Sequence, residues 1–217
     1  MGAWIGLFLP IALLAAFPDL SVAARAEKQP PPVPAEEYPL YDLVVRSKYL
    51  MSGTTLVLIE RLTVARVDKD EREYLSREFF EEQGLFGGQL PAALLDDFFS
   101  KLKAPSRLEA KFNFGVQYRF FSNGVPEEPE VSLAPIPASS RPGLAQDAPS
   151  AVGVLRLSRV GFTPREDQAL VYVEEERPDG AGGGLLIRLH RRGKVWTITD
   201  TEVLWVSRTD EPGQESP

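Results

Sequence analysis

The chain has 217 residues, the usual size of a single domain, and its hydrophobic fraction of 43% is that of an ordinary globular protein. Its formal net charge of −7 provides no basic face for nucleic acid and disfavours docking on anionic lipid. Cysteine is absent, which excludes disulfides, thiolate metal ligands and a cysteine nucleophile.

The first 26 residues have the pattern of a secretory signal peptide. The apolar run from Ala3 to Phe17 is shorter than the roughly 20 residues that a membrane span needs, and small residues follow it. We expect cleavage after Ala26, with Val22-Ala23-Ala24 as a second candidate. No Lys or Arg precedes the apolar run, which leaves open that residues 1–26 stay attached as a membrane anchor.

A proline-rich linker over residues 27–36 is expected next, because successive prolines cannot support a helix or a sheet ladder. We expect one folded domain over residues 37–207 and a disordered tail over residues 208–217.

The domain begins with a helical pattern. Apolar side chains recur at steps of three and four from about residue 38, and Ser52-Gly53 ends the element. The stripe contains Tyr38, Tyr41 and Tyr49, for which we favour packing on a sheet over lining a ligand groove.

The next elements are one strand and two short helices. Residues 54–67 are rich in β-branched side chains and predict a strand, bent near Glu60-Arg61. Helices are predicted from about residue 71 to a stop at Gly84, and again from Pro91, which suits a first helical turn.

An aromatic strand and a long loop follow. Apolar residues occupy the even positions from Phe112 to Phe120, which is the period of a strand, and Asn123-Gly124 ends it. Residues 125–150 contain six prolines and little apolar material, so we expect a disordered surface loop inside one domain.

The last third predicts strands joined by short connections, over residues 152–162, 168–176, 185–189 and 195–206. Such connections favour an antiparallel meander. We therefore predict an α+β fold in which N-terminal helices pack on a curved antiparallel sheet that ends in a C-terminal β-meander.

Two register changes are also predicted. Trp196 and Ile198 have the opposite parity to Trp205, so one β-bulge near residues 200–202 would place both tryptophans inside. A matching change is expected across Ser158-Arg159.

No residue is assigned a catalytic, cofactor-binding or metal-binding role. His190 is the only histidine, and we favour an exposed position at a strand end over a catalytic base. One His without Cys cannot supply the usual zinc ligands. The remaining groups weighed are Asp96-Asp97, the run from Glu174 to Glu176, Asp200 with Glu202, the Gly180–Gly184 loop, and the cations Arg188, Arg191, Arg192 and Lys194. Each is explained better by a solvated surface or a flexible turn.

Residues 158–207 carry a pattern of short motifs. It consists of Ser158-Arg159-Val160-Gly161-Phe162, then Ala169 to Tyr172, then Gly193-Lys194-Val195-Trp196, then Trp205-Val206-Ser207. The pattern resembles a group of uncharacterised bacterial exported proteins, which implies export but no activity. The Gly-x-Trp-x-Ile strand also resembles cystatin-like and nuclear-transport-factor-like sheets, in which a curved sheet wraps a helix.

The leading functional hypothesis is an exported, non-catalytic binding or interaction domain, secreted or periplasmic, whose partner is an unknown protein or small ligand. Two alternatives stay open. One is a carboxylate-based enzyme with a pocket between sheet and helices, and the other is a membrane-anchored accessory protein of the cell envelope. They differ in whether carboxylates converge in a concave site and in whether residues 1–26 remain attached.

Overall fold

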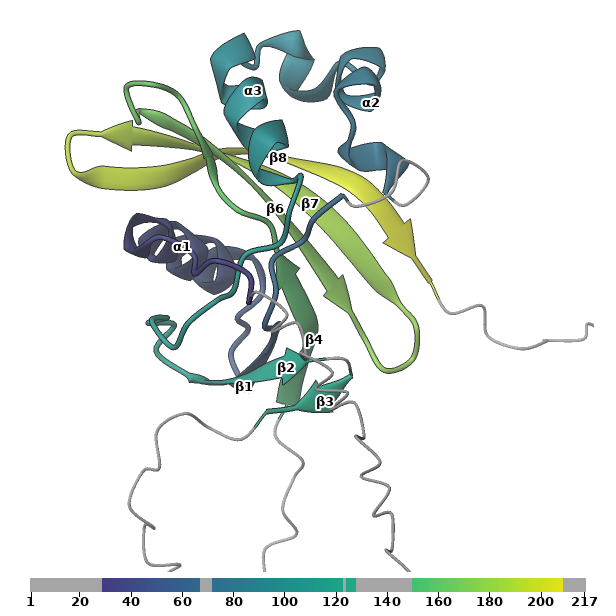
Figure 1. Ribbon diagram of the computed structural model, residues 1–217. Helices are drawn as coiled ribbons and strands as arrows, with labels where there is room; N and C mark the ends of the chain where they lie inside the picture. Colours follow the sequence, from purple (N-terminus) through teal and green to yellow (C-terminus); the bar gives the residue numbers. More distant parts are fainter. Residues whose placement is uncertain (1–28, 67–71, 123, 128–149, 209–217) are drawn as a thin grey trace, which may run out of the picture.

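The computed structural model describes residues 29–66, 72–122, 124–127 and 150–208. The predicted signal peptide, most of the predicted loop and nearly all of the predicted tail lie outside these residues. Helices and strands of the described part assemble into one α+β unit around a mixed sheet (Figure 1).

The helices are η1 (Ala35–Glu37), α1 (Tyr38–Lys48), η2 (Glu73–Leu75), α2 (Arg77–Glu82), η3 (Leu85–Gly88) and α3 (Ala92–Lys101). The strands are β1 (Thr54–Glu60), β2 (Gln117–Ser122), β3 (Val125–Pro126), β4 (Ser150–Leu157), β5 (Gly161–Phe162), β6 (Gln168–Glu176), β7 (Gly182–Arg192) and β8 (Val195–Ser207). None of the helices in the described ranges is both long and apolar enough to cross a membrane.

The sheet is mixed, so the prediction of an antiparallel sheet was wrong for its first half. The strand order is β3-β2-β1-β4-β6-β7-β8, with β5 also paired to β6. β1 is parallel to both β2 and β4, whereas β4, β6, β7 and β8 pair antiparallel, so the predicted meander is present. Parallel neighbours need a long crossover connection, and the stretch from β1 to β2 holds η2, α2, η3 and α3.

Helices lie on both faces of the sheet (Figure 1). On one face, side chains of α1 share a core cluster with odd-numbered residues of β6, and on the other face α2 and α3 cover even-numbered ones. The first cluster includes Tyr41, Val44, Val171 and Val173; the second includes Phe80, Phe98, Leu170 and Tyr172. The alternation of side chains along β6 thus separates two cores, as strand geometry requires.

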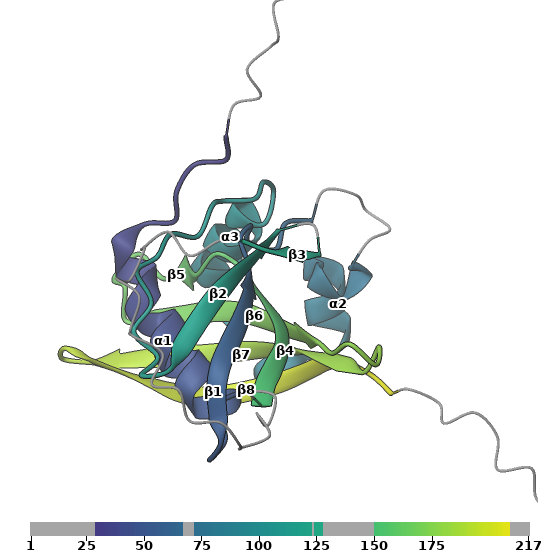
Figure 2. The same ribbon diagram turned by 90° about the horizontal axis from the view of Figure 1, so that it is seen from below.

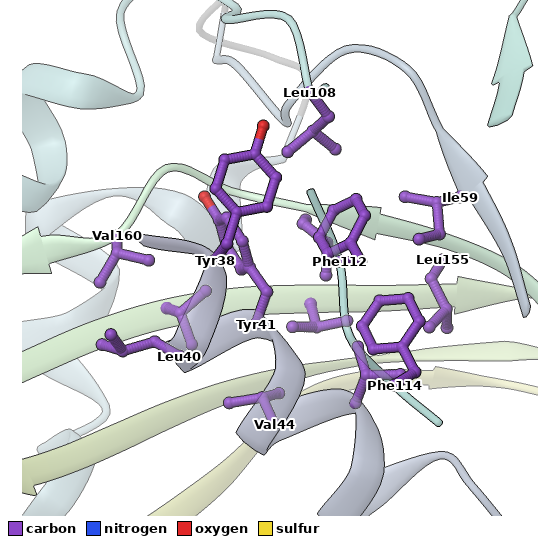
Figure 3. Close-up of a cluster of buried hydrophobic side chains, with 14 of the residues drawn as sticks. Tyr38, Leu40, Tyr41, Val44, Ile59, Leu108, Phe112, Phe114, Leu155 and Val160 are labelled. Atoms are coloured by element: carbon purple, nitrogen blue, oxygen red, sulfur yellow. The ribbon is translucent and has the colours of Figure 1, made fainter. Parts of the chain in front are cut away.

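The three stripe tyrosines are buried, and the hydroxyl of Tyr41 lies inside the core rather than at the rim that the sequence favoured. Figure 3 shows Tyr38 and Tyr41 on α1 beside Phe112, whose ring both of them contact. The hydroxyl of Tyr41 donates to the carbonyl of Ser158 at 2.9 Å.

The aromatic segment before β2 differs from its prediction. β2 begins only at Gln117, and Phe112 and Phe114 precede it in irregular backbone. Both rings are nevertheless buried, with their centroids 4.9 Å apart, and Phe112 contacts Tyr38. Their alternation therefore came from burial against α1, which a strand and an extended loop satisfy equally. The predicted loop also begins later than expected, because Val125–Pro126 forms β3.

The predicted bulge in β8 is present, but it is not alone. One register shift lies between Arg188 and Leu189 of β7 and leaves Thr199 as the extra residue on β8; another lies between Gly184 and Leu185 and leaves Leu204. The first shift places Val203 on the face of Ile198, and the second turns Trp205 to the opposite face. The two tryptophans therefore do not share a face.

The second predicted register change takes the form of a break. β4 ends at Leu157 and β5 begins at Gly161, and Leu157 and Val160 are both fully buried in the α1 core. The helix predicted from about residue 71 is divided into η2 and α2, which begins only at Arg77, whereas α3 begins next to its predicted start at Pro91. Ser76 caps α2 by accepting from the N–H of Phe79, and Gly84 adopts a positive φ of 58° where the chain leaves it.

Candidate functional site

The strands of the meander are longer than α1, the helix that covers one face of the sheet. An α-helix rises about 1.5 Å per residue, so the 11 residues of α1 span about 16 Å, whereas the 13 residues of β8 span roughly 40 Å. Figure 2 shows β7 and β8 extending past α1, with β1 and β2 running across them. The ends of β6, β7 and β8 therefore continue beyond the C-terminus of α1.

A groove of about 1020 Å³ occupies this position, and we call it the end groove. Its walls are the turn after α1, the β6–β7 connection and the C-terminal part of β8. Its lining includes Tyr49, Met51, Leu185, Val203, Trp205 and Val206. Among the stripe tyrosines, Tyr49 thus reaches a groove wall, while its hydroxyl donates to the carbonyl of Val173 at 3.4 Å.

Apolar side chains are exposed in the end groove. Met51 is 74% exposed, Val203 58% and Val206 63%. These are three of the six large hydrophobic side chains that stand out as exposed in the described ranges. Val203 pairs with Leu185 and Val206 with Gly183, so both valines lie on the face that α1 covers further along. The groove floor is an uncovered continuation of the α1 core.

The glycine-rich connection has a packing role here. Gly182, Gly183 and Gly184 form the first residues of β7, and Trp205 lies opposite Gly184. A Cβ atom at Gly184 would collide with Nε1 of Trp205 and would approach the hydroxyl of Tyr172 to 2.5 Å. The flexible-turn interpretation of residues 180–184 was therefore incomplete, because Gly184 is required by close side-chain packing.

A buried polar chain fixes the indole of Trp205. Its Nε1 donates to the hydroxyl of Tyr172 at 2.7 Å, and that hydroxyl donates to Glu174 at 2.7 Å. Arg72 donates to the same carboxylate at 3.1 Å. Burial and then the charge of Glu174 raise the pKa of Tyr172 far above its ordinary value, so its phenol stays protonated and remains a donor.

The charged side chains at the rim of the end groove differ in whether they form ion pairs. Glu175 accepts from the N–H of Gly153 at 3.1 Å and pairs with Arg177 at 3.3 Å. Asp179 accepts from the N–H of Ala181 at 3.0 Å. Lys48 and Arg208 also line the groove, and in the part of the chain that the structure describes neither forms an ion pair.

A second cleft of about 500 Å³ lies between η1, α3 and the β5–β6 connection. Four carboxylates line it, namely Glu36, Glu37, Asp97 and Glu166. Glu37 is only 1% exposed and accepts from Arg159 at 2.7 Å, from Tyr41 at 2.8 Å and from the N–H of Val160 at 2.8 Å. Asp97 accepts from Lys101 at 2.8 Å and from the N–H of Phe162 at 2.7 Å. Glu37 thus accepts at both of its oxygens, whereas Asp97 accepts both bonds at Oδ2.

The candidates weighed from the sequence are scattered over the molecule. His190 is half-buried near the end of β7, and Asp200 is exposed on β8, where Glu202 accepts from the N–H of Phe86 at 3.0 Å. Glu174 is buried rather than solvated, so that expectation was wrong for it, whereas Glu176 pairs with Arg156 at the surface. Among the described residues, no group of three or more His, Asp or Glu side chains is placed to hold a metal ion.

Sequence reasoning missed the burial of Glu37 and of the chain from Trp205 to Glu174. Both carboxylates lie beside other acidic residues in the sequence, which makes them look like solvent-facing charges. The only local indication of the buried chain from Trp205 to Glu174 was the aromatic and glycine content around Tyr172 and Gly184.

Comparisons with known protein families, with characterised proteins and with solved structures find no match. The resemblance to uncharacterised exported proteins therefore rests only on the motifs within residues 158–207.

Proposed function

We propose that the chain is an exported, non-catalytic binding domain, and that the end groove is its binding site for an apolar ligand. The observation that carries this proposal is the gathering of Met51, Val203 and Val206, each more than half exposed, in the groove. Contiguous exposed apolar surface is costly in water and commonly marks a binding site. A volume of about 1020 Å³ is at the upper end of the range for small-ligand pockets.

The frame of this site is the predicted arrangement of a curved sheet around an N-terminal helix. In the proposal α1 fills the middle of the concave face, and the strand ends beyond Lys48 stay available to a ligand. The resemblance to cystatin-like and nuclear-transport-factor-like sheets, which is one of fold only, implies a curved sheet that wraps a helix and forms a pocket.

Rigid packing below the groove supports the proposal. On the face of the sheet opposite to Val203, the indole of Trp205 packs against Gly184 and donates to Tyr172, which donates to Glu174. A preorganised wall lowers the entropy that binding would otherwise cost. The test is a titration of the purified protein with N-phenyl-1-naphthylamine, an uncharged apolar fluorophore. We expect saturable binding at one site, and a response that does not saturate would overturn the proposal.

Export is proposed from residues 1–26 and places the domain outside the cell or in the periplasm. Intact mass after fractionation of the cell envelope tests it. A soluble species that begins at Glu27 is expected. A full-length species in the membrane fraction would contradict it and would favour the membrane-anchored accessory protein instead.

The carboxylate-based enzyme is the less well supported alternative. The second cleft does bring acidic residues together, but Glu37 and Asp97 each accept from a cation and from a backbone N–H. A general acid or base must present an oxygen to the substrate, and these bonds occupy both oxygens of Glu37 and Oδ2 of Asp97.

A further inference from the structure

The rim of the end groove indicates the chemical class of the ligand. Resting on the proposed function, we infer that the ligand is a long-chain monocarboxylate, whose hydrocarbon chain lies on the apolar floor and whose carboxylate meets Lys48 and Arg208.

The charge balance of the rim is the first support. Arg177 is neutralised by Glu175, which leaves the cations Lys48 and Arg208 and the anion Asp179, a net charge of +1 at the rim. Lys48 and Arg208 therefore supply a local positive charge on a chain whose net charge is −7. Lys48 lies at the C-terminus of α1, where a cation is favourable even without a ligand. Arg208 belongs to no helix, so the same explanation does not apply to it.

The groove floor is the second support, because it suits a hydrocarbon chain better than a peptide. Gly183 pairs with Val206 and Leu185 with Val203, so the floor lies on the face of the β7–β8 ladder rather than along its open edge. A peptide laid on these side chains would leave its own amides without partners, which is costly.

The edge of the sheet is the third support. Addition of a peptide strand to β8 would need a regular edge, but bulges at Thr199 and Leu204 interrupt it. Bulged edges are a recognised protection against strand addition. The face of the sheet beyond α1 therefore stays the available surface, and its chemistry is apolar with a cationic rim.

Calorimetry with three matched probes tests the inference: decanoate, 1-decanol and decyltrimethylammonium. We expect decanoate to bind about fivefold more tightly than 1-decanol at low salt, as two exposed charge contacts allow, and the cation to bind more weakly than both. The advantage of decanoate should shrink in 0.5 M NaCl, because exposed charges are screened.

The double variant Lys48→Gln, Arg208→Gln should bind decanoate and 1-decanol with equal affinity. A matched control, Arg192→Gln with Lys194→Gln at the exposed β7–β8 turn, removes the same charge outside the groove and should leave the fivefold preference intact. Loss of the preference in the control as well would overturn the inference, since a nonspecific charge effect would then explain it.

The remaining outcomes separate the two proposals. Equal binding of decanoate and 1-decanol by the unmodified protein would overturn the carboxylate inference and leave the apolar groove standing. Failure of all three probes together with N-phenyl-1-naphthylamine would overturn both. Binding to phosphatidylglycerol vesicles without binding of free decanoate would overturn the inference in favour of a membrane surface.

Discussion

Trp205 and Tyr172 meet across an intervening strand. Trp205 belongs to β8 and Tyr172 to β6, yet the indole Nε1 and the phenolic oxygen are 2.7 Å apart over β7. They can do so because Gly184, opposite Trp205, has no side chain to separate them. This contact joins the wall of the end groove to the buried carboxylate of Glu174.

Gly184→Ala is expected to destabilise the fold by about 1–3 kcal/mol, the usual range for overpacking a dense site, because the new methyl would collide with Trp205 and Tyr172. Urea unfolding measures the change. Gly183→Ala is the matched control, since a Cβ there meets the carbonyl of Trp205 at 3.3 Å and Cγ2 of Val206 at 3.9 Å, without a collision. The packing explanation fails if both variants lose the same free energy of unfolding.

Glu37→Gln is expected to cost about 3 kcal/mol, because it breaks the ion pair between Arg159 and a carboxylate that is only 1% exposed. The neighbouring Glu36 is exposed, so Glu36→Gln should change the free energy of unfolding by less than about 0.5 kcal/mol. Chemical denaturation of both variants gives the comparison. An equal, small effect of the two substitutions would show that Glu37 does not anchor η1.

The meander and the first helix could be predicted from the sequence, because short connections and a regular apolar period leave few alternatives. The direction of β1 could not, because its own residues carry no information about which strands flank it. Trp205 illustrates the same limit at one residue. Parity predicted one bulge near residues 200–202, and the first bulge lies close by at Thr199. The second, at Leu204, accompanies the contact of Trp205 with Gly184 and Tyr172, which are far away in the sequence.

The site was harder to predict than the fold. An exposed Val203 or Val206 looks like any strand residue until the length of α1 is known. Glu37 and Glu174 have acidic neighbours in sequence, and only the tertiary structure brings Arg159 and Arg72 to them.

Asp42→Asn is expected to stabilise the protein at pH 7. Burial raises the pKa of Asp42, although the N–H of Asn113 opposes the shift, so the ionised form is less favourable in the folded state than in the unfolded one. The folded pKa exceeds the unfolded one, so Asp42 lowers stability as pH rises through these two values and has no effect below both.

Thermal unfolding at pH 7 and pH 3 measures this effect. The Asn variant should have the higher Tm at pH 7, and the difference should vanish at pH 3, because an amide oxygen still accepts from Asn113. A Tm difference that is the same at both pH values would rule out an ionisation effect.

The comparison of two valines on β8 tests the central proposal most directly. Val206 and Val195 are both 63% exposed, but only Val206 lines the end groove. Each is replaced by Asp, and N-phenyl-1-naphthylamine binding is measured at equal protein concentration, with circular dichroism to verify the fold. We predict at least a tenfold loss of affinity for Val206→Asp and none for Val195→Asp. Equal affinities in the two variants would contradict the assignment of the end groove as the binding site.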